Sequence, residues 1–263
     1  MLRLHANCHP IVLSVLLMTL GTPIIAADLE LYETHAYPSA EGPLLYRLLK
    51  PADYSPDKKY PLVLFLHGAG ERGDDNQKPL VHVAGVFTES EARVQYPCFV
   101  VVPQCPAGQL WCDTPWNVDT VAQPAHASKA MTQTMQLLGE LEKQYSIDAN
   151  RRYILGLSMG GFGTWDAITR YPGKFAAAVP MCGGGDVKKA AVLKDMPIWN
   201  FHGDQDGAVR VQLSRDMIAA VRDAGGQPRY TEYPGVGHNC WTPATQEPQL
   251  LPWLFSQSLN AAK

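Results

Sequence analysis

The sequence has few charged residues and no long run of one charge sign. Charged side chains make up 18% of the 263 residues, below the usual quarter or so, and the net charge is -3. Neither a nucleic acid nor an anionic surface is therefore indicated as a partner. Repeats, low-complexity tracts and linker-like stretches are also missing, whereas 46% of the residues are hydrophobic. This composition predicts one compact globular domain with a sizeable core.

Zinc-type cysteine spacings are missing as well, so we expect no metal site, and no motif implies a cofactor. Loss of the first of six cysteines with a leader segment would leave five, of which at least one stays unpaired. Cys105 and Cys112 are close in sequence across a loop containing proline and glycine, and Cys182 and Cys240 each lie just beyond a motif described below. These are the two pairings we consider, as hypotheses only.

The N-terminal segment has the three parts of a secretory signal peptide. Arg3 precedes an apolar run from Ile11 to about Ile25, and the small residues Ala26 and Ala27 follow. Pro23 and the short run argue against a stable membrane span, which needs about 20 apolar residues. We therefore expect a signal peptide over residues 1–27, a single mature domain over residues 28–263, and a secreted or periplasmic protein.

Strand-like and helix-like segments alternate through the second half of the chain. Leu62–Leu66 and Phe99–Val102 are continuous apolar runs, typical of strands buried on both faces. Further strands are predicted over Leu29–His35, Leu44–Lys50, Tyr153–Leu157, Ala176–Met181, Ile198–Phe201 and Tyr230–Tyr233, and helices over Ala127–Tyr145, Phe162–Tyr171, Val211–Ala224 and Gln249–Leu259. This order predicts a mostly parallel central sheet with helices on both faces and no large lid domain.

A serine between glycines follows one of these strands directly. Gly156-x-Ser158-x-Gly160 is the pattern of a nucleophile elbow, in which a strained turn from strand to helix exposes the serine. Small neighbours are needed because the turn brings backbone very close to backbone. The pattern by itself is also compatible with a plain tight turn, so a base, an acid and an oxyanion hole must be found elsewhere in the chain.

Chain order selects the base, since an elbow serine is followed first by its acid and then by its histidine. Only His202 and His238 follow Ser158, and His202 precedes the acid candidates. His238, in the loop after the last predicted strand, is therefore the predicted base. Two acids, Asp204 and Asp206, follow the strand that ends near His202. We favour Asp206, which lies further out on the turn, whereas Asp204 is better placed to cap the loop.

An oxyanion hole needs two backbone N–H groups directed at the developing negative charge. Met159, the residue after the nucleophile, supplies one. The second is expected from the small-residue loop His67-Gly68-Ala69-Gly70 after the strand Leu62–Leu66, and we place it at Ala69.

Four segments together carry a family resemblance: Leu62–Gly73, Tyr153–Trp165, Phe201–Val209 and Tyr230–Trp241. From about Leu44 to the C-terminus the chain resembles secreted bacterial esterases of the α/β-hydrolase superfamily. The similar branch comprises phospholipase/carboxylesterase, dienelactone-hydrolase-like and prolyl-oligopeptidase-like proteins. In such proteins the pattern His-Gly-x-x-Asp places the acid, which here falls on Asp206. The family pattern often continues with Val-Pro, whereas this chain has Val209-Arg210.

The resemblance implies a serine carboxylic-ester hydrolase that acts through an acyl-enzyme on small-molecule esters, including carbohydrate and aryl esters. Glu71, Arg72, Trp111 and Trp241 are the candidate substrate-binding residues, and Trp116 is a further aromatic side chain that could line the same cleft. One alternative is a small serine peptidase of the prolyl-oligopeptidase-like type, although no propeller domain precedes the catalytic one. Another is a non-catalytic binding protein on a hydrolase scaffold. The sequence gives no indication of the oligomeric state.

Overall fold

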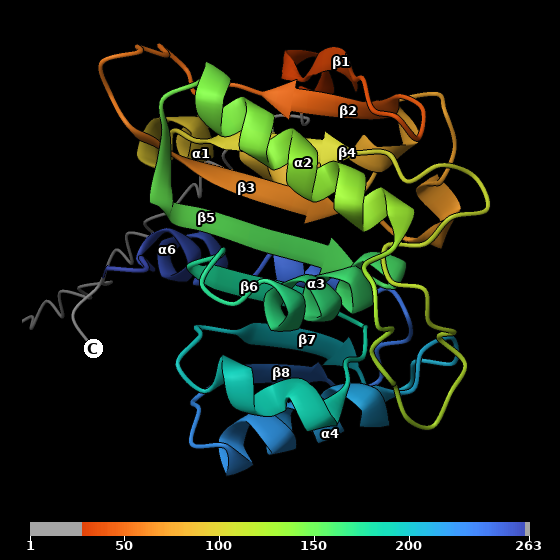
Figure 1. Cartoon of the computed structure of the whole chain (residues 1–263). Coiled ribbons are helices and arrows are strands. Elements are labelled where there is room, and N and C mark those ends of the chain that lie inside the picture. Colours follow the sequence, from red (N-terminus) through yellow and green to blue (C-terminus); the bar gives the residue numbers. More distant parts are fainter. Residues whose placement is uncertain (1–27, 261–263) are drawn as a thin grey trace, which may run out of the picture.

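A single eight-stranded sheet runs through the protein, and helices lie on both of its faces (Figure 1). The computed structural model describes residues 28–260, so the predicted signal peptide lies outside the described residues. Within residues 28–260, no helix has the length and apolar character needed to cross a membrane.

The strand order is β1-β2-β4-β3-β5-β6-β7-β8. The strands are β1 (Glu33–Tyr37), β2 (Leu44–Leu49), β3 (Tyr60–Leu66), β4 (Phe99–Pro103), β5 (Ile147–Leu157), β6 (Ala177–Met181), β7 (Trp199–Gly203) and β8 (Arg229–Tyr233). The β1–β2 and β2–β4 pairs are antiparallel, and all other neighbours are parallel. The predicted mostly parallel sheet is therefore confirmed.

Helices cover the two faces unequally. The helices are α1 (Ser90–Gln95), α2 (Lys129–Gln144), α3 (Met159–Arg170), α4 (Val211–Asp223), α5 (Trp241–Thr245) and α6 (Leu250–Phe255). The three longest, α2, α3 and α4, lie on one face, whereas α1 and α6 lie behind the sheet (Figure 1). In the described part of the chain only short 3-10 turns and loops join these elements, with no separate lid domain among them.

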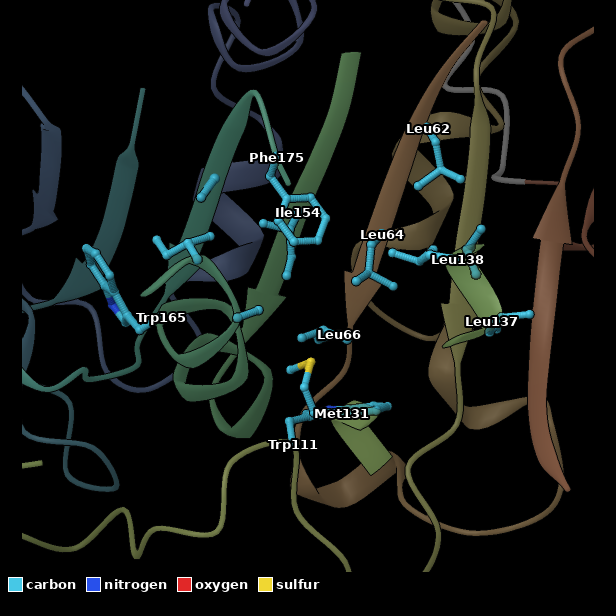
Figure 2. Packing of buried hydrophobic residues seen from close by; sticks show 14 of the residues in the cluster. Leu62, Leu64, Leu66, Trp111, Met131, Leu137, Leu138, Ile154, Trp165 and Phe175 are labelled. Carbon is cyan, nitrogen blue, oxygen red and sulfur yellow. The ribbon is translucent and has the colours of Figure 1, made fainter. Parts of the chain in front are cut away.

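Alternate residues of the buried strands build two cores. In β3, Leu62, Leu64 and Leu66 face the layer formed by α2 and α3, and Figure 2 shows them near side chains of α2 such as Met131 and Leu138. Val63 and Phe65 belong to the opposite core, which includes residues of α5 and α6, the period-two pattern of a strand. Because β3 is buried on both faces, its sequence is a continuous apolar run, as predicted.

Four predicted element boundaries are wrong by three residues or more. The strand predicted to start at Tyr153 is longer, since β5 starts at Ile147. The segment predicted as a strand from Leu29 begins with a 3-10 turn that Asp28 caps by accepting from the Glu30 N–H, and β1 starts only at Glu33. Helix α3 begins at Met159, directly after the elbow, and not at Phe162. The last helix ends at Phe255. In contrast, α4 ends next to Gly225, whose φ of 91° is the left-handed backbone expected past a helix end.

The proposed cysteine pairings are also corrected. All five cysteines of the described residues are free and buried, including Cys105 and Cys112. Cys182 and Cys240 do lie close to each other, since the Cys240 thiol contributes to raising the pKa of Cys182, but both are free thiols. The Cys240 thiol also donates to the Phe201 carbonyl at 3.7 Å.

The start of α3 leaves no room for a side chain at Gly160. An added β-carbon there would lie 1.9 Å from the Leu66 carbonyl oxygen at the end of β3. We expect Gly160→Ala to lower the free energy of unfolding by about 3 kcal/mol or more, because backbone has to move. Gly139 in α2 is the control, since an added β-carbon meets nothing within 4 Å. There, Gly139→Ala should stabilise by about 1 kcal/mol.

Urea denaturation of the two variants and the parent at neutral pH measures both effects. Equal stability of the two alanine variants would contradict the close approach of α3 to β3.

Candidate active site

Three loops at the carboxyl ends of parallel strands bring the predicted serine, acid and histidine together. Ser158 follows β5, Asp206 follows β7, and His238 follows β8. In parallel sheets this edge is where functional groups gather, because each strand delivers its following loop to the same side. Ser158 and His238 are 80 residues apart in the sequence, and the parallel arrangement of the strands brings them into contact.

The backbone at Ser158 is strained. Its φ of 54° and ψ of -119° lie in a region that residues other than glycine rarely occupy. The Ser158 N–H donates to the Met181 carbonyl at the end of β6, at 2.9 Å, which anchors the turn to the sheet. A β-carbon on Gly156 would lie 2.1 Å from the Gly160 carbonyl oxygen, so both glycines of the pattern are needed for the turn to close.

A continuous hydrogen-bonded chain links the acid to the serine. Asp206 Oδ2 lies 2.7 Å from His238 Nδ1, and His238 Nε2 lies 2.9 Å from Ser158 Oγ. Since a carboxylate only accepts, Nδ1 carries the imidazole proton and Nε2 accepts from the serine hydroxyl. The Asp206 side chain is fully buried and that of His238 is 29% exposed, so the chain runs from the interior to the surface.

The buried Asp206 carboxylate is held by four donors. Oδ1 accepts from the N–H groups of Ala208 and Val209, and Oδ2 accepts from His238 and His202. Burial disfavours the charged form, but the hydrogen bonds from the two histidines and the two amides outweigh it, and the pKa of Asp206 lies well below its usual range. Asp204 accepts from the Gly235 N–H at 2.7 Å, so it caps the neighbouring loop as expected.

His202 is a second, buried histidine on the same carboxylate. Its Nε2 lies 3.1 Å from Asp206 Oδ2 and 3.1 Å from the Val209 carbonyl, and because both partners are acceptors the proton is on this nitrogen. Its Nδ1 meets the Ser214 hydroxyl at 2.8 Å. Sequence reasoning excluded His202 as the base and gave it no role. Its position four residues before Asp206, in His-Gly-x-x-Asp, is the signal that could have indicated this contact.

The two predicted oxyanion donors each open a helical segment. Ala69 is the first residue of the 3-10 turn Ala69–Glu71, and Met159 is the first residue of α3. N–H groups at such positions have no partner inside the helix. Across residues 28–260, neither N–H has a hydrogen-bond acceptor. The loop of Ala69 lies against the serine, since a β-carbon built on Gly68 would be 3.6 Å from Ser158 Cβ.

Side chains hold three successive carbonyls of this loop. Trp111 Nε1 donates to the His67 carbonyl at 3.0 Å, and Arg72 Nε donates to the Ala69 carbonyl at 2.9 Å. Between them, the Gly68 carbonyl lies 2.6 Å from His67 Nδ1. The loop is therefore fixed from within the protein, although it has little regular structure.

These contacts correct the prediction for Trp111. Its ring is fully buried, packs edge-on against His67, and has no surface to offer a substrate. Arg72 lies near the site, but its guanidinium already donates to the carbonyls of Ala69 and Gln109.

Glu71 and Trp241 lie together on one side of the site. Glu71 pairs with His82 at 3.5 Å, His82 packs against the Trp241 ring, and Trp241 packs edge-on against His238 at 5.4 Å between ring centres. Burial works against the Glu71 charge, but the hydrogen bond with His82 and the neighbouring histidines outweigh it and lower its pKa. Sequence reasoning missed His82, which has no motif to mark it.

A metal ion would have to compete with this network. Cys182 Sγ, Asp206 and His238 have potential ligand atoms within 4.8 Å of one another. However, both Asp206 oxygens and the facing His238 nitrogen are engaged in the hydrogen bonds above. Burial and the neighbouring Cys240 thiol raise the pKa of Cys182, so it is a thiol and a poor metal ligand.

The strand order, the parallel register and the strained elbow define an α/β-hydrolase fold. Comparison with protein families matches residues 54–247 to the phospholipase/carboxylesterase family, and the chain belongs to it. The crystal structure of a thermostable esterase superposes with a TM-score of 0.81 and 41% identity, over 87% of this chain and 64% of that one.

Curated relatives are more distant. The bifunctional acetylxylan esterase/xylanase XynS20E of Neocallimastix patriciarum is 28% identical over 173 residues, which is 66% of this chain and 23% of that protein. The carboxylesterase SOBER1 of Arabidopsis thaliana is 24% identical over 67% of this chain and 82% of its own length. The chain thus spans about a quarter of the first of these relatives and most of the second.

The buried His67 makes the protein sensitive to acid. Burial lowers the pKa of His67 from 6.5 to about 4. Between these values the unfolded chain binds a proton that the folded one does not, so stability falls as the pH drops, by about 1.4 kcal/mol per unit. We expect His67→Asn, which cannot titrate, to lose this part of the slope.

Urea denaturation of the parent and His67→Asn at several pH values between about 4.5 and 6.5 measures the difference, because all other titrating groups are shared. Parallel stability curves would show that His67 is not buried in its neutral form.

Proposed function

We propose that this protein is a serine carboxylic-ester hydrolase that works through an acyl-enzyme. The observation that carries the proposal is the unbroken series of hydrogen bonds from Asp206 through His238 to Ser158, which lies on a strained turn. Beside it are two N–H groups that have no acceptor within residues 28–260. Membership of the phospholipase/carboxylesterase family and the likeness to a thermostable esterase support it.

In this mechanism Ser158 Oγ attacks the ester carbonyl while His238 Nε2 takes its proton. Asp206 holds the imidazole in the required tautomer and stabilises the imidazolium that forms. The N–H groups of Ala69 and Met159 bind the oxyanion of the tetrahedral intermediate. His238 then protonates the leaving alcohol, and water repeats the two steps on the acyl-enzyme.

We propose small-molecule esters as the substrates, with aryl or carbohydrate groups on the Trp241 side. Trp241 is half-buried against His238, and Glu71 and His82 follow it, so an aromatic face and polar groups adjoin the nucleophile. Such a surface suits flat rings and hydroxylated groups. The relative named as an acetylxylan esterase/xylanase supports carbohydrate esters.

We also propose that the mature protein starts after Ala27 and is exported, on the basis of the signal-peptide pattern in its first 27 residues. The N-terminal sequence of protein recovered outside the cytoplasm tests this, and an intact N-terminus there would contradict the cleavage.

Ser158→Ala removes the proposed nucleophile and should lower kcat for p-nitrophenyl acetate by about a millionfold, because the serine and histidine act as one unit. A fluorophosphonate probe should label the parent and not this variant. Ser90→Ala is the control, because Ser90 is exposed at the start of α1, which lies on the face of the sheet opposite to α3. A parent protein that the probe does not label would favour a binding protein on a hydrolase scaffold.

Trp241→Ala tests the proposed substrate side. It should lower kcat/KM for a feruloyl ester about fivefold to tenfold more than for p-nitrophenyl acetate. The reason is that the feruloyl ring loses one aromatic contact, which acetate does not make. Trp116→Ala is the matched control, because Trp116 is also half-buried but packs against the cluster around Phe162. Kinetics on acetylated sugars, feruloyl esters and prolyl anilides give the comparison. Equal effects at both tryptophans would remove Trp241 from the site, and preferred cleavage of the anilides would indicate a peptidase.

A further inference from the structure

We propose that His67 is a positioning residue that aims the Ala69 N–H at the oxyanion. Its Nδ1–H fixes the peptide between Gly68 and Ala69, and the inference rests on the proposed function because it takes Ala69 as an oxyanion donor. His67 takes no part in the hydrogen bonds that join Asp206, His238 and Ser158. The sequence motif places His67 in the loop but does not predict its function.

The contacts of His67 leave one tautomer. The Cys105 N–H donates to Nε2 at 2.9 Å, and a backbone amide can only donate, so Nε2 holds a lone pair. Nδ1 therefore carries the proton and donates it to the Gly68 carbonyl at 2.6 Å. The side chain is 1% exposed, so water does not compete with either bond. His67 is a neutral, doubly engaged imidazole at the end of β3.

The planarity of the peptide transmits this bond to the site. In a trans peptide the carbonyl of one residue and the N–H of the next point in opposite directions. Since His67 draws the Gly68 carbonyl inward, the Ala69 N–H of the same plane must point outward. That N–H has no acceptor anywhere in residues 28–260, and its loop borders Ser158.

The other contacts of the loop do not replace this one. Trp111 donates to the carbonyl of His67, which belongs to the peptide before the one between Gly68 and Ala69. Arg72 donates to the carbonyl of Ala69, which belongs to the peptide after it. Among residues 28–260, only His67 forms a hydrogen bond with the peptide that contains the Ala69 N–H. With Nδ1–H removed, this peptide can rotate between two fixed neighbours, and the donor loses its direction while the loop stays in place.

Two substitutions separate the two nitrogens. Asn carries its amide nitrogen at the position of Nδ1 and can still donate to the Gly68 carbonyl, whereas Gln reaches the position of Nε2 and cannot. We expect His67→Gln to lower kcat for p-nitrophenyl acetate by about tenfold to a hundredfold, less than the full loss of one oxyanion donor, with KM changed less than about twofold. His67→Asn should stay within about threefold of the parent kcat.

A double-mutant cycle with Ala69→Pro tests whether His67 acts through the Ala69 N–H. Proline has no N–H, is tolerated at the first position of a helical turn, and here follows Gly68 in an extended conformation. Ala69→Pro alone should lower kcat by about a hundredfold to a thousandfold. In its presence, His67→Gln should cost nothing further, because the donor that His67 orients is gone.

Two results would overturn the proposal and leave His67 a merely structural residue. One is that the losses in kcat from His67→Gln and Ala69→Pro multiply in the double variant. The other is that His67→Asn and His67→Gln lower kcat equally. Unchanged kcat in Ala69→Pro would overturn it too, by removing the donor. Failure of the parent itself to hydrolyse esters or bind the fluorophosphonate is a different result and rejects the proposed function. Thermal unfolding of each variant confirms folding.

The histidine ¹⁵N shifts of the parent protein are a readout that needs no variant. They should show His67 with a protonated Nδ1 and an unprotonated Nε2 at neutral pH, and the reverse tautomer would overturn the proposal.

Discussion

The close approach of helix α3 to the ends of β3 and β6 is the constraint on which the site depends. A β-carbon on Gly160 would strike the Leu66 carbonyl, and one on Gly161 would lie 2.4 Å from the Met181 carbonyl. Packing at this distance leaves Ser158 no relaxed conformation between β5 and α3. The positive φ is thus a consequence of how the helix packs on the sheet, and the sheet supplies the stability that sustains the strain. An exposed serine with a fixed direction is the result.

The second constraint is a fully buried carboxylate that remains charged. A buried charge is costly unless it is paired and hydrogen-bonded, and Asp206 meets both conditions with four donors. One of these donors, His238, leads to the serine, and the others tie the carboxylate to β7 and its loop. His202 on the opposite side means that Asp206 cannot turn away from His238 without losing another bond.

Much of the fold and the catalytic chain could be predicted, because local patterns and chain order carry that information. Continuous apolar runs marked the buried strands, and the order serine, acid, histidine left few candidates for Asp206 and His238. The contacts of His67 and Trp111 could not be predicted in this way. Both depend on loops after β3 and β4 that meet only when those strands pair, so a tryptophan in a loop was expected at a surface and is in fact buried. Strand β1 was misplaced because a cap by Asp28, and not periodicity, sets its start.

The carbonyls around Gly68 show how side chains can hold the backbone of a loop in place. Each of the three successive carbonyls has a donor from a different side chain, of which two come from the loop itself and one from beyond β4. Electrostatic stabilisation of a transition state works when donors are oriented before the reaction, since they then need no reorganisation as charge develops. Orientation of backbone N–H groups cannot be encoded by the identity of the residue that carries them. It can be set through the carbonyl on the other side of the same peptide. The Phe162 N–H holds that carbonyl for Met159, as part of helix α3, and the proposed role of His67 is to hold it for Ala69.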